Sequence, residues 1–298
     1  MPGLINVFKP AGWTSRDIVT EVRRRLGIKK AGHAGTLDPG AVGVLLVLLG
    51  RATRIQRYMT ELEKQYIAEV TLGIETDSSD AFGTVMQVQR RPGVSLSSFR
   101  DILTDFIGDV SQVPPMTSAV KHRGRPLYEL ARKGVVVDRD PRSVTIRRLD
   151  LLDWRADDEF PRALLLVECS SGTYIRTLVS DIARAAGTCG YMSHLTRTQV
   201  GDFTASGSVL LEDISDEAIV RAGEALRFLR CITLTPEDAG LVSHGNRPRH
   251  VELDLFDDRE VVRAMSAGGD LLAIGEVYRD GTGGDPSFRP RRVFNPPL

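Results

Sequence analysis

The sequence predicts a protein in which helices and strands are mixed, with a compact β module at the C-terminal end. Apolar residues recur at helical spacing in residues 15 to 26 and again in residues 95 to 107. In residues 66 to 72 they alternate with more polar neighbours, which is the two-residue period of a half-buried strand. From Thr233 onward, short apolar runs are separated by Gly, Asp and Pro, a pattern typical of a small β fold.

The N-terminal part begins with a well-marked helix. Thr14, Ser15 and Asp17 supply capping groups ahead of the apolar stripe of residues 15 to 26, and a glycine follows as the stop signal. The next segment, GHAGTLDPGAVGVLLVLLG, covers residues 32 to 50. It opens with a glycine-rich turn and ends in an apolar run that fits either a strand or a buried helix.

The rest of the chain alternates between element types. Residues 114 to 142 begin with a turn-forming Pro-Pro and predict an excursion from the core, with a short helix near Leu127. Residues 164 to 187 predict a strand, a turn and a helix, and we expect a mostly helical stretch from there to about residue 230. We place a boundary near residue 231, which divides the chain into domains of residues 1 to 230 and 231 to 298.

The charges are unevenly distributed, although the net charge is zero. Between Lys121 and Arg148 there are nine basic residues against three acids, and acids collect instead in residues 212 to 217 and 252 to 260. This asymmetry predicts one side that faces a polyanion. The alternative is that the basic residues form ordinary solvated helix faces.

The composition argues against several classes of protein. The hydrophobic share of 42% and charged share of 26% are ordinary for a globular protein. Three cysteines without a CxxC pair and five histidines without ligand spacing give no support for a disulfide framework or a metal centre. The N-terminus resembles no signal peptide and no apolar run approaches the roughly 18 residues of a membrane span, so we expect a cytoplasmic protein.

Asp38 is the first candidate for chemistry, because it lies in GTLDPG between a glycine-rich turn and an apolar segment. A carboxylate in such a place is partly desolvated, and it needs a nearby cation to remain ionised. The alternative is a simple turn residue before proline. A nucleotide P-loop is excluded, because Ala41 and Val42 stand where that motif requires Lys and Ser or Thr.

The segment GHAGTLDPGAVGVL, residues 32 to 45, resembles the signature of the TruB family of tRNA pseudouridine synthases, which contains that family's catalytic aspartate. Further segments match in the family's order: NVFKPAGWTS (6 to 15), KQYIAEVTLGIETDSSDAFG (64 to 83), PPMTSAVKHRGRPLYELARKG (114 to 134), CSSGTYIRTL (169 to 178) and HLTRTQVGDF (194 to 203). The resemblance covers most of the first 205 residues.

The resemblance implies an α+β fold: a mixed, mostly antiparallel central sheet with flanking helices, of the pseudouridine synthase type. It implies an isomerase that converts uridine to pseudouridine without a cofactor or a metal. Asp38 is then the essential carboxylate, Arg176 its charge partner, and Tyr66 a catalytic residue that also stacks on the target base. Without the resemblance, Arg176 is equally a surface residue at a helix start, and Tyr66 a core residue.

The resemblance also implies residues that bind substrate: His33, Tyr66, Asp80, Lys121, Tyr174 and Leu195. The implied substrate is the T-arm of tRNA, with the uridine at its position 55 as target. Residues 231 to 298 resemble a PUA domain, a small β fold that binds structured RNA. We expect a monomer that needs no protein partner.

Two other functions use the same basic surface. A tRNA-folding chaperone binds without catalysis and has no use for an ion pair between Asp38 and Arg176. A guide-RNA-dependent synthase of ribosomal RNA acts with partner proteins, and the short termini without basic tails favour the standalone type.

The chain departs from the family pattern at two places. Thr117, Ser118 and Ala119 stand where the family often has Tyr-Ser-Ala, and TCGYMS precedes His194 on an expected helix. We expect both to lie away from Asp38 and to affect RNA contacts rather than the reaction.

Overall fold

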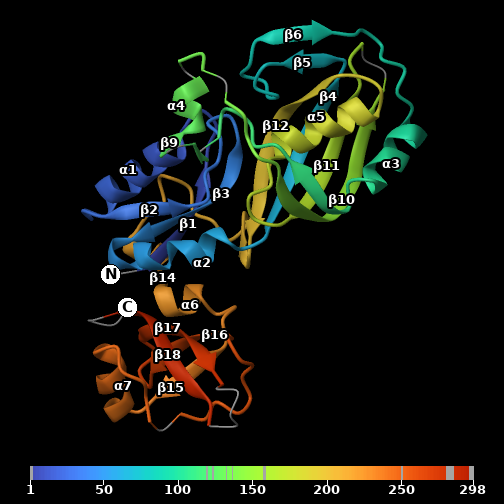
Figure 1. Cartoon of the computed structure of the whole chain (residues 1–298). Helices are drawn as coiled ribbons and strands as arrows, with labels where there is room; N and C mark the ends of the chain where they lie inside the picture. Colours follow the sequence, from blue (N-terminus) through green and yellow to red (C-terminus); the bar gives the residue numbers. More distant parts are fainter. Residues whose placement is uncertain are drawn as a thin grey trace.

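The computed structural model describes residues 3–118, 120–122, 124–131, 133–135, 137–156, 159–249, 251–279 and 285–294. Within these residues the chain forms a ten-stranded sheet with flanking helices and a separate four-stranded sheet near the C-terminus (Figure 1). No helix in these ranges has the length and apolar character needed to cross a bilayer.

The large sheet is mixed and mostly antiparallel, as predicted. Its main path runs through β14 (Val220–Arg221), β1 (Gly3–Lys9), β3 (Val42–Leu49), β12 (Gly190–Val200), β4 (Lys64–Leu72), β11 (Arg162–Cys169), β10 (Arg142–Arg155) and β7 (Gly108–Gln112). Two short strands, β2 (Ala31–Ala34) and β13 (Phe203–Thr204), pair with β3 and β12. Among these pairings, β3 and β12 are parallel and the others antiparallel.

The apolar run after Asp38 is strand β3, which resolves the choice between strand and helix. Leu45, Val47 and Leu49 pack in one core cluster beneath α1 (Ser15–Arg25), whereas Val44, Leu46 and Leu48 pack in another cluster on the opposite face. Because both faces are covered, the strand is apolar throughout and shows no alternation.

The predicted helices form close to their expected bounds. α1 begins with a capping box between Thr14 and Asp17, and α3 (Leu96–Thr104) begins at its N-cap Ser95. α5 (Ile175–Ala185) packs with α3 against a core cluster made by β4, β10 and β11. Two short helices, η1 (Gly50–Ile55) and α2 (Gln56–Thr60), follow β3.

The prediction of a mostly helical stretch from about residue 188 to 230 is wrong. β12 occupies its first part, followed by β13, η2 (Asp216–Ala218), β14 and the four-residue helix α6 (Ala222–Ala225). In β12 buried and half-buried positions do alternate, but the buried ones include Gly190 and the charged Arg197. Because a charged residue occupies a buried position, the apolar residues of this strand do not show a clear two-residue period.

Two hairpins lie outside the large sheet. β5 (Ile74–Thr76) and β6 (Val85–Val88) form one of them, at the far end of the large domain from the C-terminal module (Figure 1). β8 (Lys121–His122) and β9 (Arg125–Pro126) form the other, followed by α4 (Leu127–Ala131), within the segment predicted as an excursion.

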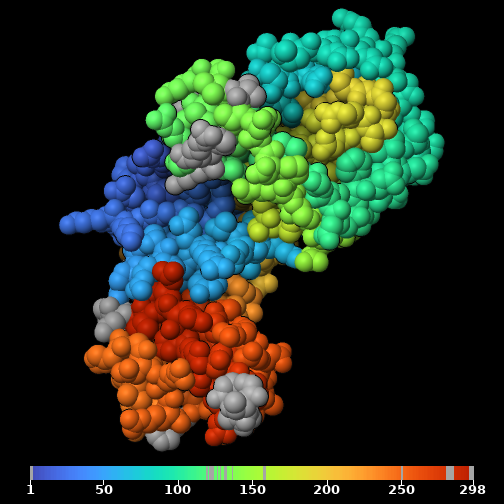
Figure 2. Space-filling view, viewed as in Figure 1, coloured from blue at the N-terminus to red at the C-terminus, as the bar shows by residue number. Residues whose placement is uncertain are grey.

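The predicted C-terminal β module is a four-stranded sheet. Its strands are β15 (Cys231–Leu234), β16 (Val261–Ser266), β17 (Leu271–Tyr278) and β18 (Ser287–Val293), and α7 (Pro236–Ser243) packs beside them. The module is not loosely tethered, because Ile274 and Phe294 share a core cluster with Leu46 and Leu48 of β3. Figure 2 shows it attached to the N-terminal part of the large domain.

Candidate active site

The loop that carries Asp38 is fastened on both sides. The buried Ser15 hydroxyl, at the start of α1, accepts from the Leu37 amide at 2.9 Å and donates to the Leu37 carbonyl at 3.0 Å. The Ala41 amide donates to the Asp38 carbonyl at 3.1 Å, which closes a turn. These contacts fix the backbone immediately before and after the carboxylate.

Lys9 holds the other side of this loop. Its side chain is fully buried, and its ammonium donates to the carbonyls of Pro10, Trp13 and Pro39 at 2.8, 2.8 and 3.1 Å. Burial lowers the pKa of Lys9 to about 8, while the Asp38 carboxylate opposes that change. One lysine therefore joins the N-terminal loop to the residue that follows Asp38.

Arg176 and Asp38 form a two-point contact. Nε of Arg176 lies 3.0 Å from Oδ2 of Asp38, and one terminal guanidinium nitrogen donates to Oδ1 at 3.4 Å. Arg176 is the second residue of α5 and is 5% exposed, so it is not a surface residue at a helix start. The Asp38 side chain keeps 34% of its surface open, so one flank of the ion pair faces solvent.

The two terminal nitrogens of the Arg176 guanidinium make further contacts. Nη1 lies 3.5 Å from Oδ2 of Asp80 and donates to the Ser78 carbonyl at 3.2 Å. It also donates to the Thr117 hydroxyl, and Nη2 donates to the Thr117 carbonyl at 3.3 Å. The expectation that Thr117 lies away from the Asp38 site is therefore wrong, because this residue contacts the charge partner of Asp38 directly.

The electrostatic balance at Asp38 is set mainly by burial. Burial raises the pKa of the Asp38 carboxyl above its ordinary value, Arg176 lowers it, and Asp80 adds a further rise. Arg176 thus acts in the expected direction without outweighing desolvation. A carboxylate in this state is less stabilised by solvent than a surface aspartate and responds to its three charged neighbours, Arg176, Asp80 and Lys9.

Tyr66 and Leu195 form an apolar wall. Both are buried, at 7% and 6% exposure, and share a core cluster with Leu37, the residue before Asp38. They project from neighbouring strands β4 and β12. Burial raises the pKa of the Tyr66 hydroxyl, so that group is a neutral phenol at neutral pH.

Arg197 was not anticipated from the sequence. It lies opposite Tyr66 in the register of β4 and β12 and is 1% exposed, and its positive charge lowers the pKa of Tyr66 against the larger effect of burial. Nε donates to the Val44 carbonyl at 2.7 Å, and the terminal nitrogens donate to the carbonyls of Thr36 and Gly35 at 3.4 and 3.2 Å. The available signal was its place two residues after Leu195, on the same strand face.

The remaining predicted site residues are His33, Tyr174 and Lys121, and they lie on three different elements. His33 is half-buried on β2; burial and Arg197 lower its pKa, and its Nδ1 has no hydrogen-bond partner among the described residues. Tyr174 caps α5, and its backbone is held by Gln112 at 2.9 and 3.2 Å. Lys121 lies on β8, where the structure describes its backbone but not its side chain.

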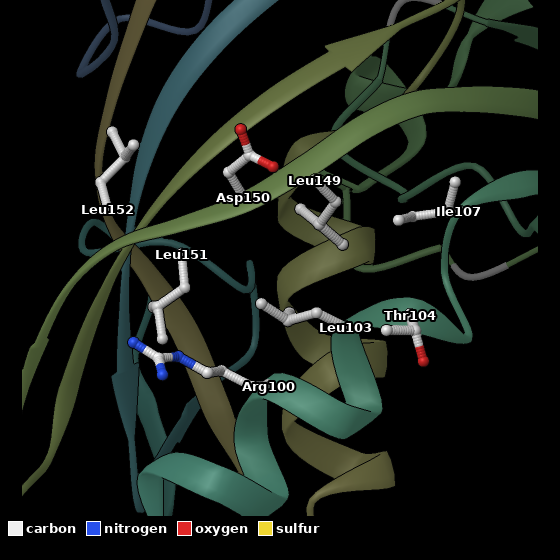
Figure 3. A pocket seen from close by; sticks show the side chains of 8 residues that line it. All are labelled: Arg100, Leu103, Thr104, Ile107, Leu149, Asp150, Leu151 and Leu152. Atoms are coloured by element: carbon white, nitrogen blue, oxygen red, sulfur yellow. The ribbon is translucent and has the colours of Figure 1, made fainter.

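A separate pocket of about 430 Å³ lies between α3 and β10 (Figure 3). Its lining is Arg100, Leu103, Thr104, Ile107, Leu149, Asp150, Leu151 and Leu152. The one carboxylate there, on Asp150, is bound by Arg148. This pocket shares no residue with the Asp38 centre and offers no unpaired carboxylate for chemistry.

Comparison with known proteins gives a consistent family. Residues 23–175 match the model described as "TruB family pseudouridylate synthase (N terminal domain)", and residues 176–241 match "tRNA pseudouridylate synthase B C-terminal domain". The chain is 45% identical to tRNA pseudouridine synthase B of Caldanaerobacter subterraneus subsp. tengcongensis, covering 98% of this chain and 99% of the relative. It is 44% identical to the same enzyme of Pelotomaculum thermopropionicum, covering 94% and 92%.

The fold also has a counterpart among solved structures. The chain resembles one in the "Crystal Structure of a Cbf5-Nop10-Gar1 Complex", with a TM-score of 0.74 and 25% sequence identity. The match covers 98% of this chain and 84% of that one.

Proposed function

Because this chain belongs to the TruB family of tRNA pseudouridine synthases, which are isomerases, we propose that it converts the uridine at position 55, in the T-arm of tRNA, to pseudouridine. Asp38 is the essential carboxylate of this proposal. The observation that supports it is the two-point contact of Asp38 with the buried Arg176. A buried, fully bonded guanidinium that holds a partly open carboxylate suits a charged reactive group.

The reaction makes modest demands on the protein. The N1–C1′ bond of uridine breaks, the ring turns, a C5–C1′ bond forms, the C5 proton leaves and N1 gains a proton. Nothing is oxidised or reduced, so the reaction calls for no cofactor. An ionised Asp38 can stabilise or attack the electron-poor C1′, remove a sugar proton, or attack C6 of the ring.

The target base must leave the RNA stack before Asp38 can reach it. In this proposal Tyr66 and Leu195 flank the detached uracil, and Tyr66 also assists proton removal. Tyr174 lines the same pocket. Tyr66, like any tyrosine, is protonated at neutral pH, and burial raises its pKa further, so its assistance depends on transfer of the phenolic proton rather than on a standing phenolate.

The remaining assignments concern RNA binding. Asp80 keeps Arg176 oriented, His33 holds the everted RNA conformation, and Lys121 contacts a phosphate. The basic segment from Lys121 to Arg148 and the PUA-like C-terminal module bind the folded arm by its shape, because the major groove of an RNA helix is poorly accessible to side chains. The protein acts on tRNA as a monomer, without a protein partner.

The decisive experiment is incubation with unmodified tRNA transcript, followed by mapping of pseudouridine. Wild-type protein is expected to modify position 55, and Asp38→Asn to abolish modification while tRNA affinity changes by no more than about threefold. The matched control is Asp202→Asn, which removes an exposed carboxylate paired with Arg227. Binding of tRNA by the wild type without any pseudouridine would instead support a tRNA-folding chaperone.

A further inference from the structure

Phe82 is an exposed aromatic residue beside the Asp38 loop. It lies in the turn between β5 and β6, and 76% of its surface is open to solvent. Its ring lies against Gly40, with Cε2 nearest, and any side chain at that position would overlap the ring atoms. Gly40 is two residues after Asp38, so the ring contacts the loop that carries the carboxylate.

The turn that presents Phe82 is tightly bonded. Oδ1 of Asp80 accepts from the Phe82 amide at 3.0 Å and from the Ser78 hydroxyl at 2.6 Å. The Ser79 carbonyl accepts from the Met192 amide of β12 at 3.1 Å, which fastens the turn to the large sheet. Gly83 is packed so closely against Asp77 and Ser78 that it has no room for a side chain.

The same carboxylate serves both the turn and the active site. One oxygen of Asp80 holds the Phe82 amide, and the other lies 3.5 Å from Arg176, which holds Asp38. The backbone that presents the exposed ring is therefore tied to the residues that hold the Asp38 carboxylate. An aromatic ring left open to water beside a proposed RNA site has its π surface available to stack on a base.

We propose that Phe82 is a stacking platform for an RNA base adjacent to the target uridine; this inference rests on the proposed function. When a uridine leaves the stack, its neighbour loses a stacking partner, and an aromatic face can replace it. The edge of the ring at Cε2 lies against Gly40, and its high exposure leaves the aromatic surface open to a base. Stacking of this kind accepts any base, because every base has a π face.

Three variants at this position separate stacking from other roles. Phe82→Ala is expected to weaken binding of unmodified tRNA by about 10-fold and to raise KM more than it lowers kcat. Phe82→Leu keeps apolar contact with Gly40 but has no π face, so it is expected to resemble Phe82→Ala. Phe82→Tyr keeps the aromatic face and is expected to stay within about twofold of wild type.

The control variant lies on the same protein hairpin as Phe82, and a labelled RNA gives a direct readout of stacking. Met86 is 67% exposed on β6, so Met86→Ala removes apolar surface without an aromatic face at Gly40, and it is expected to bind as wild type does. A T-arm hairpin with 2-aminopurine next to the target position reports stacking directly. Its fluorescence is expected to fall on binding wild type and to fall much less with Phe82→Ala.

Two results would overturn this inference: wild-type affinity in Phe82→Ala, or full retention of affinity and fluorescence quenching in Phe82→Leu. Both are judged against wild-type protein that forms pseudouridine, so they leave the proposed function intact. If wild-type protein forms no pseudouridine, the proposed function fails first. Because Phe82 is so exposed, thermal unfolding of all variants is expected to match wild type, which excludes misfolding as the cause.

Discussion

The guanidinium of Arg197 donates to the carbonyl of Val44 at 2.7 Å, where β12 and β3 run parallel. The same side chain binds the carbonyls of Gly35 and Thr36. Arg197 therefore ties together the two ends of the loop that contains Asp38. A charge at 1% exposure is tolerated at this point because its donors meet three backbone acceptors.

Replacement of Arg197 by Met is expected to damage both stability and activity. Three carbonyls lose a charged donor, and each unsatisfied buried group costs about 1 to 3 kcal/mol, so the free energy of unfolding should fall by about 3 kcal/mol or more. Urea unfolding measures this loss, and pseudouridine formation should fall in parallel. The control is Arg184→Ala, an exposed arginine paired with Asp181, which should change the free energy of unfolding by less than about 0.5 kcal/mol. Unchanged unfolding of Arg197→Met would refute this role.

The pH dependence of the reaction should reflect the environment of Asp38. Burial raises the pKa of its carboxyl above the ordinary 3.8, so the ionised form is lost at a higher pH than in a surface aspartate. Single-turnover rates in wild type should therefore fall on acidification before an ordinary aspartate would titrate. Arg176→Lys retains one positive charge but loses the two-point contact, so its acid limb should move to still higher pH. If the acid limb of Arg176→Lys lies at the same pH as that of wild type, the two-point contact of Arg176 does not control the ionisation of Asp38.

The stability contribution of Asp38 has the opposite sign from that of a typical ion-paired carboxylate. Its pKa is raised in the folded protein, so its protonated form is favoured by folding. That contribution is fully present below the ordinary pKa and is lost as the pH rises through the folded pKa. The site therefore gives up some stability to keep a charged carboxylate at neutral pH, as is common for reactive groups.

Individual elements with strong local signals could be predicted from the sequence, whereas the mixed, mostly antiparallel sheet was implied by the family resemblance. α1 and α3 begin at the expected capping residues, and β4 shows the expected alternation. The failure at β12 has a physical cause. Its buried positions include Arg197, and hydrophobic periodicity cannot register a charged side chain whose partners are carbonyls distant in sequence.

The candidate site was predictable only in part. The resemblance indicated Asp38, Arg176 and Asp80, and the structure brings these three side chains together. Arg197 and Phe82 were missed because their relevance depends on tertiary contacts, with Val44 in one case and Gly40 in the other. The contacts of these two residues are set by the folded chain, and the one local signal was the place of Arg197 two residues after Leu195.

Thr117 provides a test specific to this chain. Its hydroxyl accepts from Arg176, and its carbonyl also accepts from that guanidinium at 3.3 Å. Thr117→Val removes the hydroxyl but keeps the shape, so the loss should amount to about 1 to 2 kcal/mol of transition-state stabilisation, or roughly 5- to 30-fold in kcat. Affinity for tRNA should change little. Thr20→Val serves as control, since the Thr20 hydroxyl bonds only the backbone of α1. Equal kcat in Thr117→Val and wild type would show that the hydroxyl does not assist Arg176.

We expect the buried Lys64 to make a pH-dependent contribution to the free energy of unfolding. It is 7% exposed at the start of β4, where its ammonium donates to the carbonyls of Thr60 and Leu62, and burial lowers its pKa from 10.5 to about 8. Between these two values the unfolded chain binds a proton that the folded chain has released, so the free energy of unfolding contributed by Lys64 should rise with pH across about 8 to 10.5.

The Lys64 prediction is tested by comparing wild type with Lys64→Met, because other groups also titrate in this range. Burial raises the pKa of Cys169 to about 11, so this thiol acts in the opposite direction. Because Lys64 and Cys169 affect each other's pKa, both proteins carry Cys169→Ala in this comparison. Urea unfolding at pH 8 and pH 10 should show the protein that retains Lys64 gaining stability relative to Lys64→Met as the pH rises. A difference that is constant with pH would mean that Lys64 keeps its ordinary pKa, and that its two carbonyl contacts compensate its burial in full.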